Sequence, residues 1–102
     1  MNGLPMDITI TRHGSRNSGE YHAHVAGHRE IGRLTWTRDG DIRIVDHTLV
    51  PAAIGGRGVA ARLVEAIIAD ARAENFRIRP DCSYVALAFS RHPEWADLRA
   101  VP

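Results

Sequence analysis

Three glycines stand within four positions of the chain, between a β-branched run and an alanine-rich apolar stretch: Gly55, Gly56 and Gly58. Glycine inside a helix costs roughly 1 kcal/mol relative to alanine, so the cluster marks the turn that precedes a helix. The first helical turn leaves backbone N–H groups unpaired and carries about half a positive charge. Because glycine has no side chain, an anion can approach those groups closely. The cluster predicts a pyrophosphate-binding turn; a turn that binds nothing is the alternative.

The segments around this turn follow a definite order of strands and helices. Period-two alternation and β-branched runs indicate strands, and apolar residues at helical spacing indicate helices. The order is four strands, a helix, a strand and a helix, at residues 7–13, 20–27, 30–38, 41–50, 58–74, 76–80 and 83–92. The first helix joins its neighbouring strands by a right-handed parallel crossover. The sequence thus predicts an α/β fold with a small mixed, mostly antiparallel sheet of about five strands and two main helices.

Composition limits what the chain can bind. Its length of 102 residues predicts a single domain, 1–102. The formal charge of +1 argues against nucleic-acid partners, and no apolar run approaches the ~20 residues that cross a bilayer. Every basic residue is arginine, which excludes Schiff-base lysine chemistry and a lysine-dependent P-loop. One cysteine and an N-terminus unlike a signal peptide predict a cytoplasmic protein, and we expect a monomer or a weak dimer.

The glycine turn has one interpretation as a dinucleotide site. Residues 56–61 match the pattern Gly-x-Gly-x-x-Ala, and Asp81 stands twenty positions further on. However, residues 51–54 separate the strand from the glycines, whereas that fingerprint follows its strand directly. Too few residues remain after the turn for a doubly wound sheet of six strands. A Rossmann-type nucleotide binder is therefore the less favoured interpretation.

A second match extends over three segments. Residues 55–60, Gly-Gly-Arg-Gly-Val-Ala, resemble the acetyl-CoA-binding motif of the GCN5-related N-acetyltransferases. The resemblance extends to a very small branch, the YjdJ-type acetyltransferase domains. There His-Thr-x-Val-Pro precedes the motif, and Pro-x-Cys-x-aromatic-Val and Arg-His-Pro-Glu-aromatic follow it, here residues 47–51, 80–85 and 91–95. One departure is Gly55, because the family usually opens the glycine motif with arginine or glutamine.

The resemblance implies a minimal fold of that family and a path for acetyl-CoA as co-substrate, with no metal. The strand at 41–50 would expose backbone groups near Thr48 and Val50 to the amides of the pantetheine arm. Arg91 and His92 would lie near the adenosine and 3′-phosphate; a solvated helix end is the alternative reading of that pair. The pyrophosphate would lie on the glycine turn, formed by Gly55, Gly56, Arg57, Gly58, Val59 and Ala60.

Two side chains are candidates for catalysis. Cys82 stands at the expected start of the second helix, where a thiol pKa is lowered, and the resemblance places it near the thioester. It could act as nucleophile or acid, or only fill space beside the cofactor. His47 could deprotonate an amine, since histidine titrates near neutrality, or a neighbouring backbone group could satisfy it. Strand alternation places Asp46 on the opposite face, so no Asp46–His47 dyad is expected.

A third group of residues, His22, His24 and His28, has a spacing that could suggest a metal. On a strand His22 and His24 share one face, but a solvated sheet surface explains them equally well. No carboxylate or thiol ligand stands in the same motif, so the sequence predicts no metal site.

These features predict an acetyl-CoA-dependent N-acetyltransferase. An amine of a small molecule or a peptide would attack the thioester directly in a ternary complex, and backbone N–H groups would polarise the carbonyl. Cys82 or a water would return a proton to the departing thiolate. The alternative is a module that binds CoA or acetyl-CoA with little or no catalysis. The sequence does not identify the amine.

Overall fold

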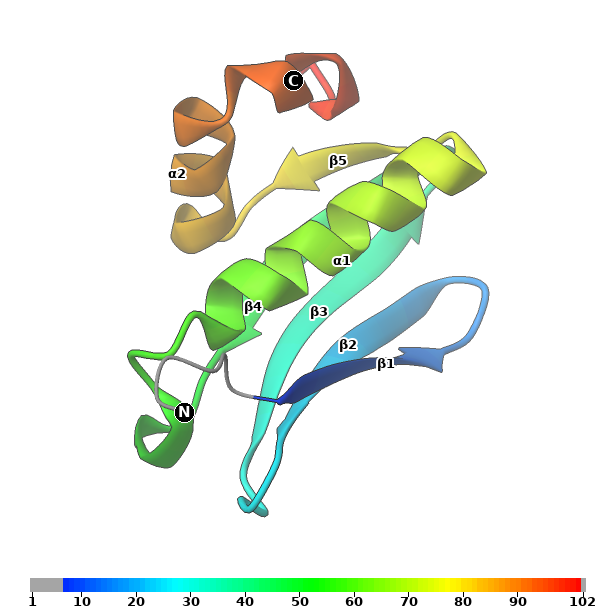
Figure 1. Cartoon of the computed structure of the whole chain (residues 1–102). Coiled ribbons are helices and arrows are strands. Elements are labelled where there is room, and N and C mark those ends of the chain that lie inside the picture. Colours follow the sequence, from blue (N-terminus) through cyan, green and yellow to red (C-terminus); the bar gives the residue numbers. More distant parts are fainter. Residues whose placement is uncertain (1–6, 102) are drawn as a thin grey trace.

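The computed structural model describes residues 7–101, and the start of the chain, on which the expectation about a signal peptide depends, lies largely outside them. Five strands form one sheet in the order β1-β2-β3-β4-β5 (Figure 1). The elements are β1 (Ile8–Gly14), β2 (Ser18–Val25), β3 (Ile31–Asp39), β4 (Ile42–Leu49), η1 (Ala52–Ile54), α1 (Val59–Glu74), β5 (Arg77–Pro80), α2 (Ser83–Arg91) and η2 (Pro93–Leu98).

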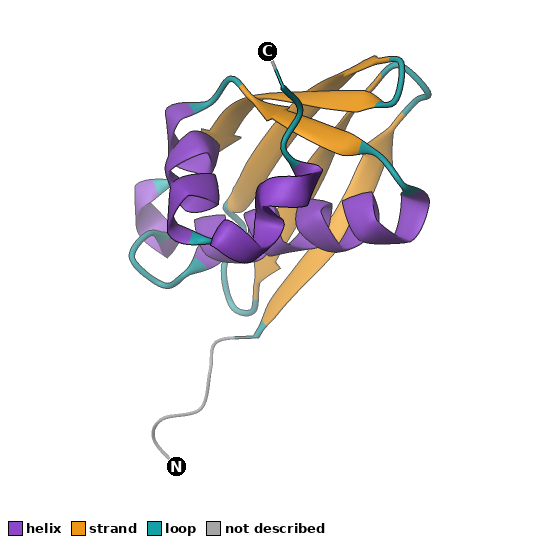
Figure 2. Ribbon diagram, turned by 90° about the horizontal axis from the view of Figure 1, so that it is seen from above, coloured by secondary structure: helices purple, strands orange, loops and turns teal. Residues whose placement is uncertain are grey.

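The strand pairing confirms the predicted fold class. β1 to β4 pair antiparallel with their neighbours, and α1 then crosses over so that β5 runs parallel to β4. The helices gather on one side of the sheet (Figure 2). Across residues 7–101, neither helix has the length and apolar character that crossing a membrane requires.

The period-two pattern of β2 separates the two faces of the sheet. Tyr21, Ala23 and Val25 are buried beneath the helices, whereas His22 and His24 belong to the alternate, less buried set. The face without helices is called the open face below. Because residues paired across antiparallel strands share a face, polar residues from β1, β2 and β3 lie together on the open face.

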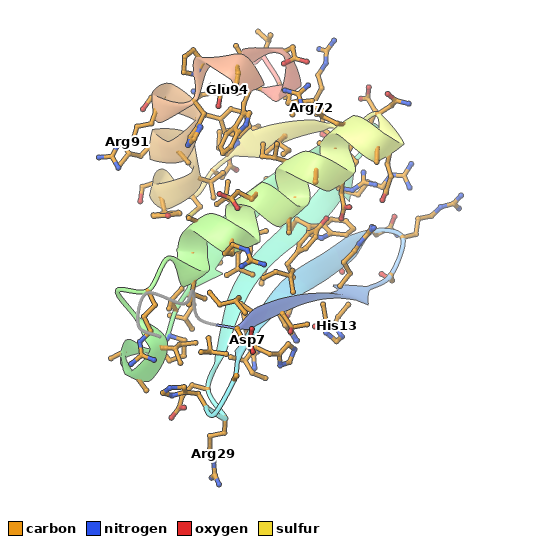
Figure 3. The ribbon with its side chains drawn as sticks, in the orientation of Figure 1. Asp7, His13, Arg29, Arg72, Arg91 and Glu94 are labelled. Carbon is orange, nitrogen blue, oxygen red and sulfur yellow. The ribbon has the colours of Figure 1, made fainter. Side chains whose placement is uncertain are left out.

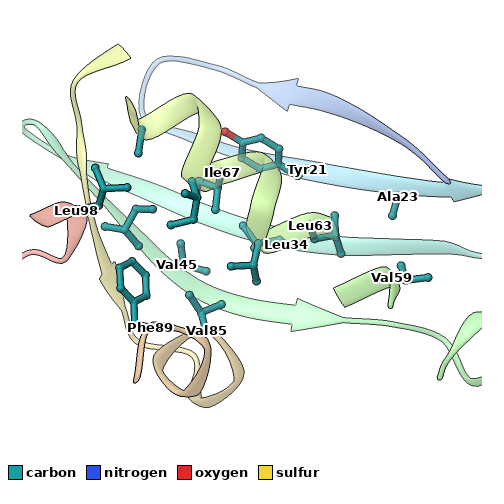
Figure 4. Close-up of a cluster of buried hydrophobic side chains, with 14 of the residues drawn as sticks. Tyr21, Ala23, Leu34, Val45, Val59, Leu63, Ile67, Val85, Phe89 and Leu98 are labelled. Atoms are coloured by element: carbon teal, nitrogen blue, oxygen red, sulfur yellow. The ribbon is translucent and has the colours of Figure 1, made fainter. Parts of the chain in front are cut away.

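The core lies between the sheet and the helices (Figure 4). α1 contributes an apolar stripe at helical spacing, which packs on β2 and β3, and α2 adds Val85 and Phe89. Gly32 of β3 lets the start of α1 come close, because a Cβ at that position would lie 2.9 Å from a methyl group of Val59. Burying one aliphatic side chain contributes about 1.5–3 kcal/mol. This packing fixes the end of α1 that follows the glycine turn.

β5 is shorter than β4, and its four residues pair with the first four residues of β4. The register joins Ile42 to Arg77 and ends at Val45 and Pro80. The Val45 carbonyl then accepts hydrogen bonds from the N–H groups of Asp81 (2.9 Å) and Cys82 (3.0 Å) as the chain turns into α2. β4 itself continues along β3 to Leu49. The second half of β4 therefore extends past the end of β5 and has no partner strand on that edge among the described residues.

Candidate functional site

The glycine turn owes its shape to positive backbone angles. Gly56 has φ 72° and Gly58 has φ 79°, in the left-handed region that favours glycine. A Cβ at either position would meet nothing within 4 Å, so the space in front of the backbone is open. The glycines therefore serve two purposes: they allow the turn, and they keep side chains away from it.

The start of α1 has a local charge that would attract an anion. Gly58 is its N-cap residue, no side chain caps the helix by a hydrogen bond, and its first turn contains no acidic residue. The helix dipole places partial positive charge at this end. Arg57 adds a full charge beside the turn, and its Nη1 lies 3.1 Å from Nε2 of His28. His28 thus belongs to the surroundings of the turn and not to the other two histidines of its sequence motif.

Cys82 and Thr48 come together past the end of β5. Cys82 is the N-cap residue of α2, and its Sγ lies within hydrogen-bond distance of Oγ1 of Thr48, at 3.5 Å. Burial would raise the pKa of the Cys82 thiol, but the Thr48 hydroxyl and the backbone N–H groups of Val85 and Tyr84 favour the thiolate. Their combined effect lowers the pKa below its ordinary value. The thiol is thus half-buried at the start of α2, in surroundings that favour its thiolate form.

His47 lies on the other side of β4. His47 pairs with Thr35 of β3, so its side chain lies on the open face. Its neighbour Thr48 pairs with the buried Leu34, so the Thr48 side chain faces the helices. The two residues proposed for catalysis from the sequence, His47 and Cys82, therefore approach the end of β4 from opposite faces.

A β-bulge overturns the expectation for Asp46. The register shifts between Thr35 and Trp36, which pair with His47 and Val45, so Asp46 is an extra residue in β4. The Thr35 hydroxyl donates to Oδ1 of Asp46 at 2.7 Å. Asp46 therefore shares the open face with His47 instead of pointing away from it. Simple alternation fails here because a bulge resets the period-two pattern.

A groove of about 200 Å³ runs between α1 and α2. Tyr84 and Leu87 line it and are 41% and 48% exposed, an apolar surface beyond the core face of α2. The sequence analysis missed these two residues, although their spacing of three along a helix is the signal of a second apolar face. The other lining residues are Ala61, Val64, Glu65, Ala88, Arg91, His92 and Trp95.

Arg91 and His92 stand at the end of α2, away from Cys82. Arg91 extends outward from the helix (Figure 3). His92 is fixed by its neighbours, because its ring stacks on Trp95 at 3.9 Å and its Nδ1 lies 2.9 Å from Oε2 of Glu94. Both residues line the groove.

Comparisons with known proteins agree with this geometry. Residues 20–98 match the family described as GCN5-related N-acetyl-transferase. The fold is similar to the solution NMR structure of a GCN5-like candidate N-acetyltransferase from Staphylococcus aureus, with a TM-score of 0.65 and 21% sequence identity. That similarity covers 100% of this chain and 93% of the other. No curated protein matches the chain. The match over residues 20–98 includes the glycine turn, both main helices and Cys82, and the chain belongs to the GCN5-related N-acetyltransferase family.

Proposed function

We propose that this acetyltransferase moves the acetyl group of acetyl-CoA to an amine of a small molecule or a peptide by direct attack in a ternary complex. The observation that carries the proposal is the junction at the end of β4. There an open, glycine-lined helix start and the Cys82 thiol flank the second half of β4, which extends past the end of β5.

The pyrophosphate of CoA would bind at the glycine turn. The backbone N–H groups of residues 56–60 and the dipole of α1 would hold its charge, with Arg57 beside them. The family usually has arginine or glutamine at the first position of this motif, and Gly55 has no such side chain. The turn would therefore bind the pyrophosphate mainly through the backbone.

The rest of the cofactor has two surfaces to occupy. The pantetheine arm would add to the free edge of β4 near Thr48 and Val50, as an extra strand does. The groove beside Tyr84 and Leu87 would cover apolar parts of the cofactor, and Arg91 would pair with its 3′-phosphate. This path ends with the thioester near Cys82.

The two proton transfers of the reaction would involve residues on opposite faces of β4. The amine nitrogen attacks the thioester carbon, and the C–N bond forms. The tetrahedral intermediate collapses, the C–S bond breaks, and CoA leaves as a thiolate. His47 would take the proton that the amine loses, from the open face, and Cys82 would give a proton to the thiolate. Solvent restores both groups, so amine and acetyl-CoA yield amide and CoA.

A module that binds CoA without catalysis is the second candidate. One observation favours it: His47, the proposed base, is exposed on the open face. The Rossmann alternative is wrong, because a mostly antiparallel sheet does not provide the doubly wound parallel frame of that fold.

Ligand titration separates these functions. We expect acetyl-CoA and CoA to bind one per chain in calorimetry and to raise the melting temperature, with no effect of NAD. A ligand at a hundred times its Kd stabilises the folded state by about 2.7 kcal/mol. No binding at millimolar CoA would contradict both the enzyme and the module. If CoA binds, turnover with a panel of amines supports the enzyme, and its absence supports the module.

A further inference from the structure

The open face of the sheet carries a cluster of three histidines that acetyl transfer does not use. His13 lies on β1 (Figure 3), and His22 and His24 lie on β2. One ring nitrogen from each lies within 4.8 Å of those of the other two. The His13 and His22 rings stack with their centroids 4.1 Å apart. One nitrogen from each of three rings therefore lies close to the other two on the open face.

The strand register explains the convergence. Thr11 pairs with His22, so His13 and His24 occupy diagonal positions on the same face, on either side of that pair. The sequence spacing had grouped His22 and His24 with His28 instead. The structure replaces His28 by His13, a residue whose cross-strand position no spacing within one segment can indicate.

Oxygen atoms hold all three rings. The Thr11 hydroxyl lies 2.7 Å from Nε2 of His13 and 3.0 Å from Nε2 of His24. Oε1 of Glu20 lies 2.7 Å from Nε2 of His22, whose side chain is only 18% exposed. A histidine that binds a metal through one nitrogen usually bonds an oxygen through the other, which fixes its ring and tautomer. In this cluster the oxygen partner of each ring is on Nε2, so such an arrangement would leave Nδ1 for the ion.

We propose that His13, His22 and His24 bind a divalent transition-metal ion of the zinc type on the open face. Neutral imidazoles are common ligands of such ions, and three of them with a water or a carboxylate complete a tetrahedral site. Zn–N bonds of 2.0–2.1 Å place tetrahedral ligands about 3.4 Å apart. The three nitrogens lie within 4.8 Å of one another, so the rings must move closer together to bind the ion, and His13 is exposed at the surface.

The bound ion joins the edge strand β1 to β2. It lies away from the glycine turn and from Cys82, so the proposal does not depend on acetyl transfer. The metal therefore acts as a cross-strand staple whose binding energy adds to the stability of the folded state.

The test uses untagged full-length protein, stripped with a chelator and titrated with Zn²⁺ alone in calorimetry. We expect one ion per chain and a higher melting temperature with Zn²⁺. The substitutions His13→Gln and His22→Gln should each weaken binding at least tenfold. His28→Gln is the matched control, because it removes the third histidine of the sequence motif and should leave Zn²⁺ affinity unchanged.

Three results would overturn the proposal. These are no Zn²⁺ binding by the wild-type protein at millimolar concentration, affinity that survives His13→Gln, and equal losses in His13→Gln and His28→Gln. A ratio of one ion per two chains would also count against a site within one chain. Circular dichroism of each variant checks that it folds, so a loss of binding can be assigned to the missing ligand.

Discussion

The position of Cys82 in the fold favours the thiolate form of its side chain. Its sulfur lies half-buried at the first turn of α2, beside Thr48, and the surrounding donors lower the pKa of the thiol. A lower pKa makes the thiol a better proton donor to the departing CoA thiolate. It also makes Cys82 a competent nucleophile. The thioester of acetyl-CoA is already activated, however, so an acetyl-cysteine intermediate would add a step with little gain.

We therefore expect Cys82→Ala to slow turnover by about ten- to a hundredfold, the low end of acid–base effects, with CoA binding retained. In the wild-type enzyme the rate should fall as pH rises through the lowered pKa of Cys82, because only the protonated thiol donates. The variant should lose that limb of the pH profile. The measurements are steady-state kinetics against pH and CoA calorimetry.

Thr48→Val is the companion variant, since it removes the hydroxyl that favours the thiolate while keeping the side-chain shape. It should move the same limb to higher pH. Mass spectrometry after mixing with acetyl-CoA alone should show unmodified protein. A kinetically competent acetyl-Cys82 enzyme would establish the covalent mechanism instead.

At the scale of elements, the junction of β4 and α1 determines whether the cofactor can bind. Gly58→Val should abolish CoA binding, because a side chain there enters the open space in front of the N–H groups. A turn with φ near −60° would accept valine without strain, but Gly58 has φ 79°. The variant should therefore also lose about 1–3 kcal/mol of stability.

Gly40→Val separates these two effects. Gly40 has φ 63° in the β3–β4 hairpin and equally open surroundings, so valine there brings similar strain at the far end of β4. We expect both variants to lose similar stability in urea unfolding and only Gly58→Val to lose CoA binding. Equal CoA affinities in the two variants would mean that the glycines serve the turn alone.

The sequence predicts a helix or strand correctly where its limits depend on residues within the same segment. The helix expected at 58–74 is Val59–Glu74, and the one at 83–92 is Ser83–Arg91, since apolar periodicity, glycines and Pro93 set their limits. Features that depend on a partner strand were not predictable. The bulge at Asp46 and the approach of His13 to His22 arise from cross-strand register, which a single strand does not encode.

At the scale of the whole molecule, a polar clamp ties the edge of the sheet to α1. The Tyr21 hydroxyl donates to Oδ2 of Asp70 at 2.6 Å, and Arg12 bridges Asp70 (3.2 Å) and Glu74 (2.8 Å). These side chains come from β2, α1 and β1. Burial of the Tyr21 ring, together with the Asp70 carboxylate, raises the pKa of the Tyr21 hydroxyl. The clamp therefore favours the folded state only while that hydroxyl is protonated.

This dependence gives a test by global unfolding. A tyrosine in the unfolded chain has a pKa of about 10. Below that pH the hydroxyl is protonated in both states, and Tyr21 contributes fully to the free energy of unfolding. Above it the unfolded chain releases a proton that the folded chain keeps, so this contribution is lost as pH rises. At pH 11 the wild-type free energy of unfolding should have lost about 1.4 kcal/mol through Tyr21. Tyr21→Phe should be less stable by about 1–2 kcal/mol at pH 8 but lack this loss.

The gap between the wild type and Tyr21→Phe in urea unfolding should therefore close between pH 8 and pH 11. Tyr84→Phe is the matched control, because Tyr84 is the other tyrosine of the chain and is 41% exposed. Its unfolding free energy should follow that of the wild type over the same range. A gap between the wild type and Tyr21→Phe that stays constant with pH would show that the clamp does not hold the Tyr21 proton. Stability at high pH would then depend on groups outside the contact between β2 and α1.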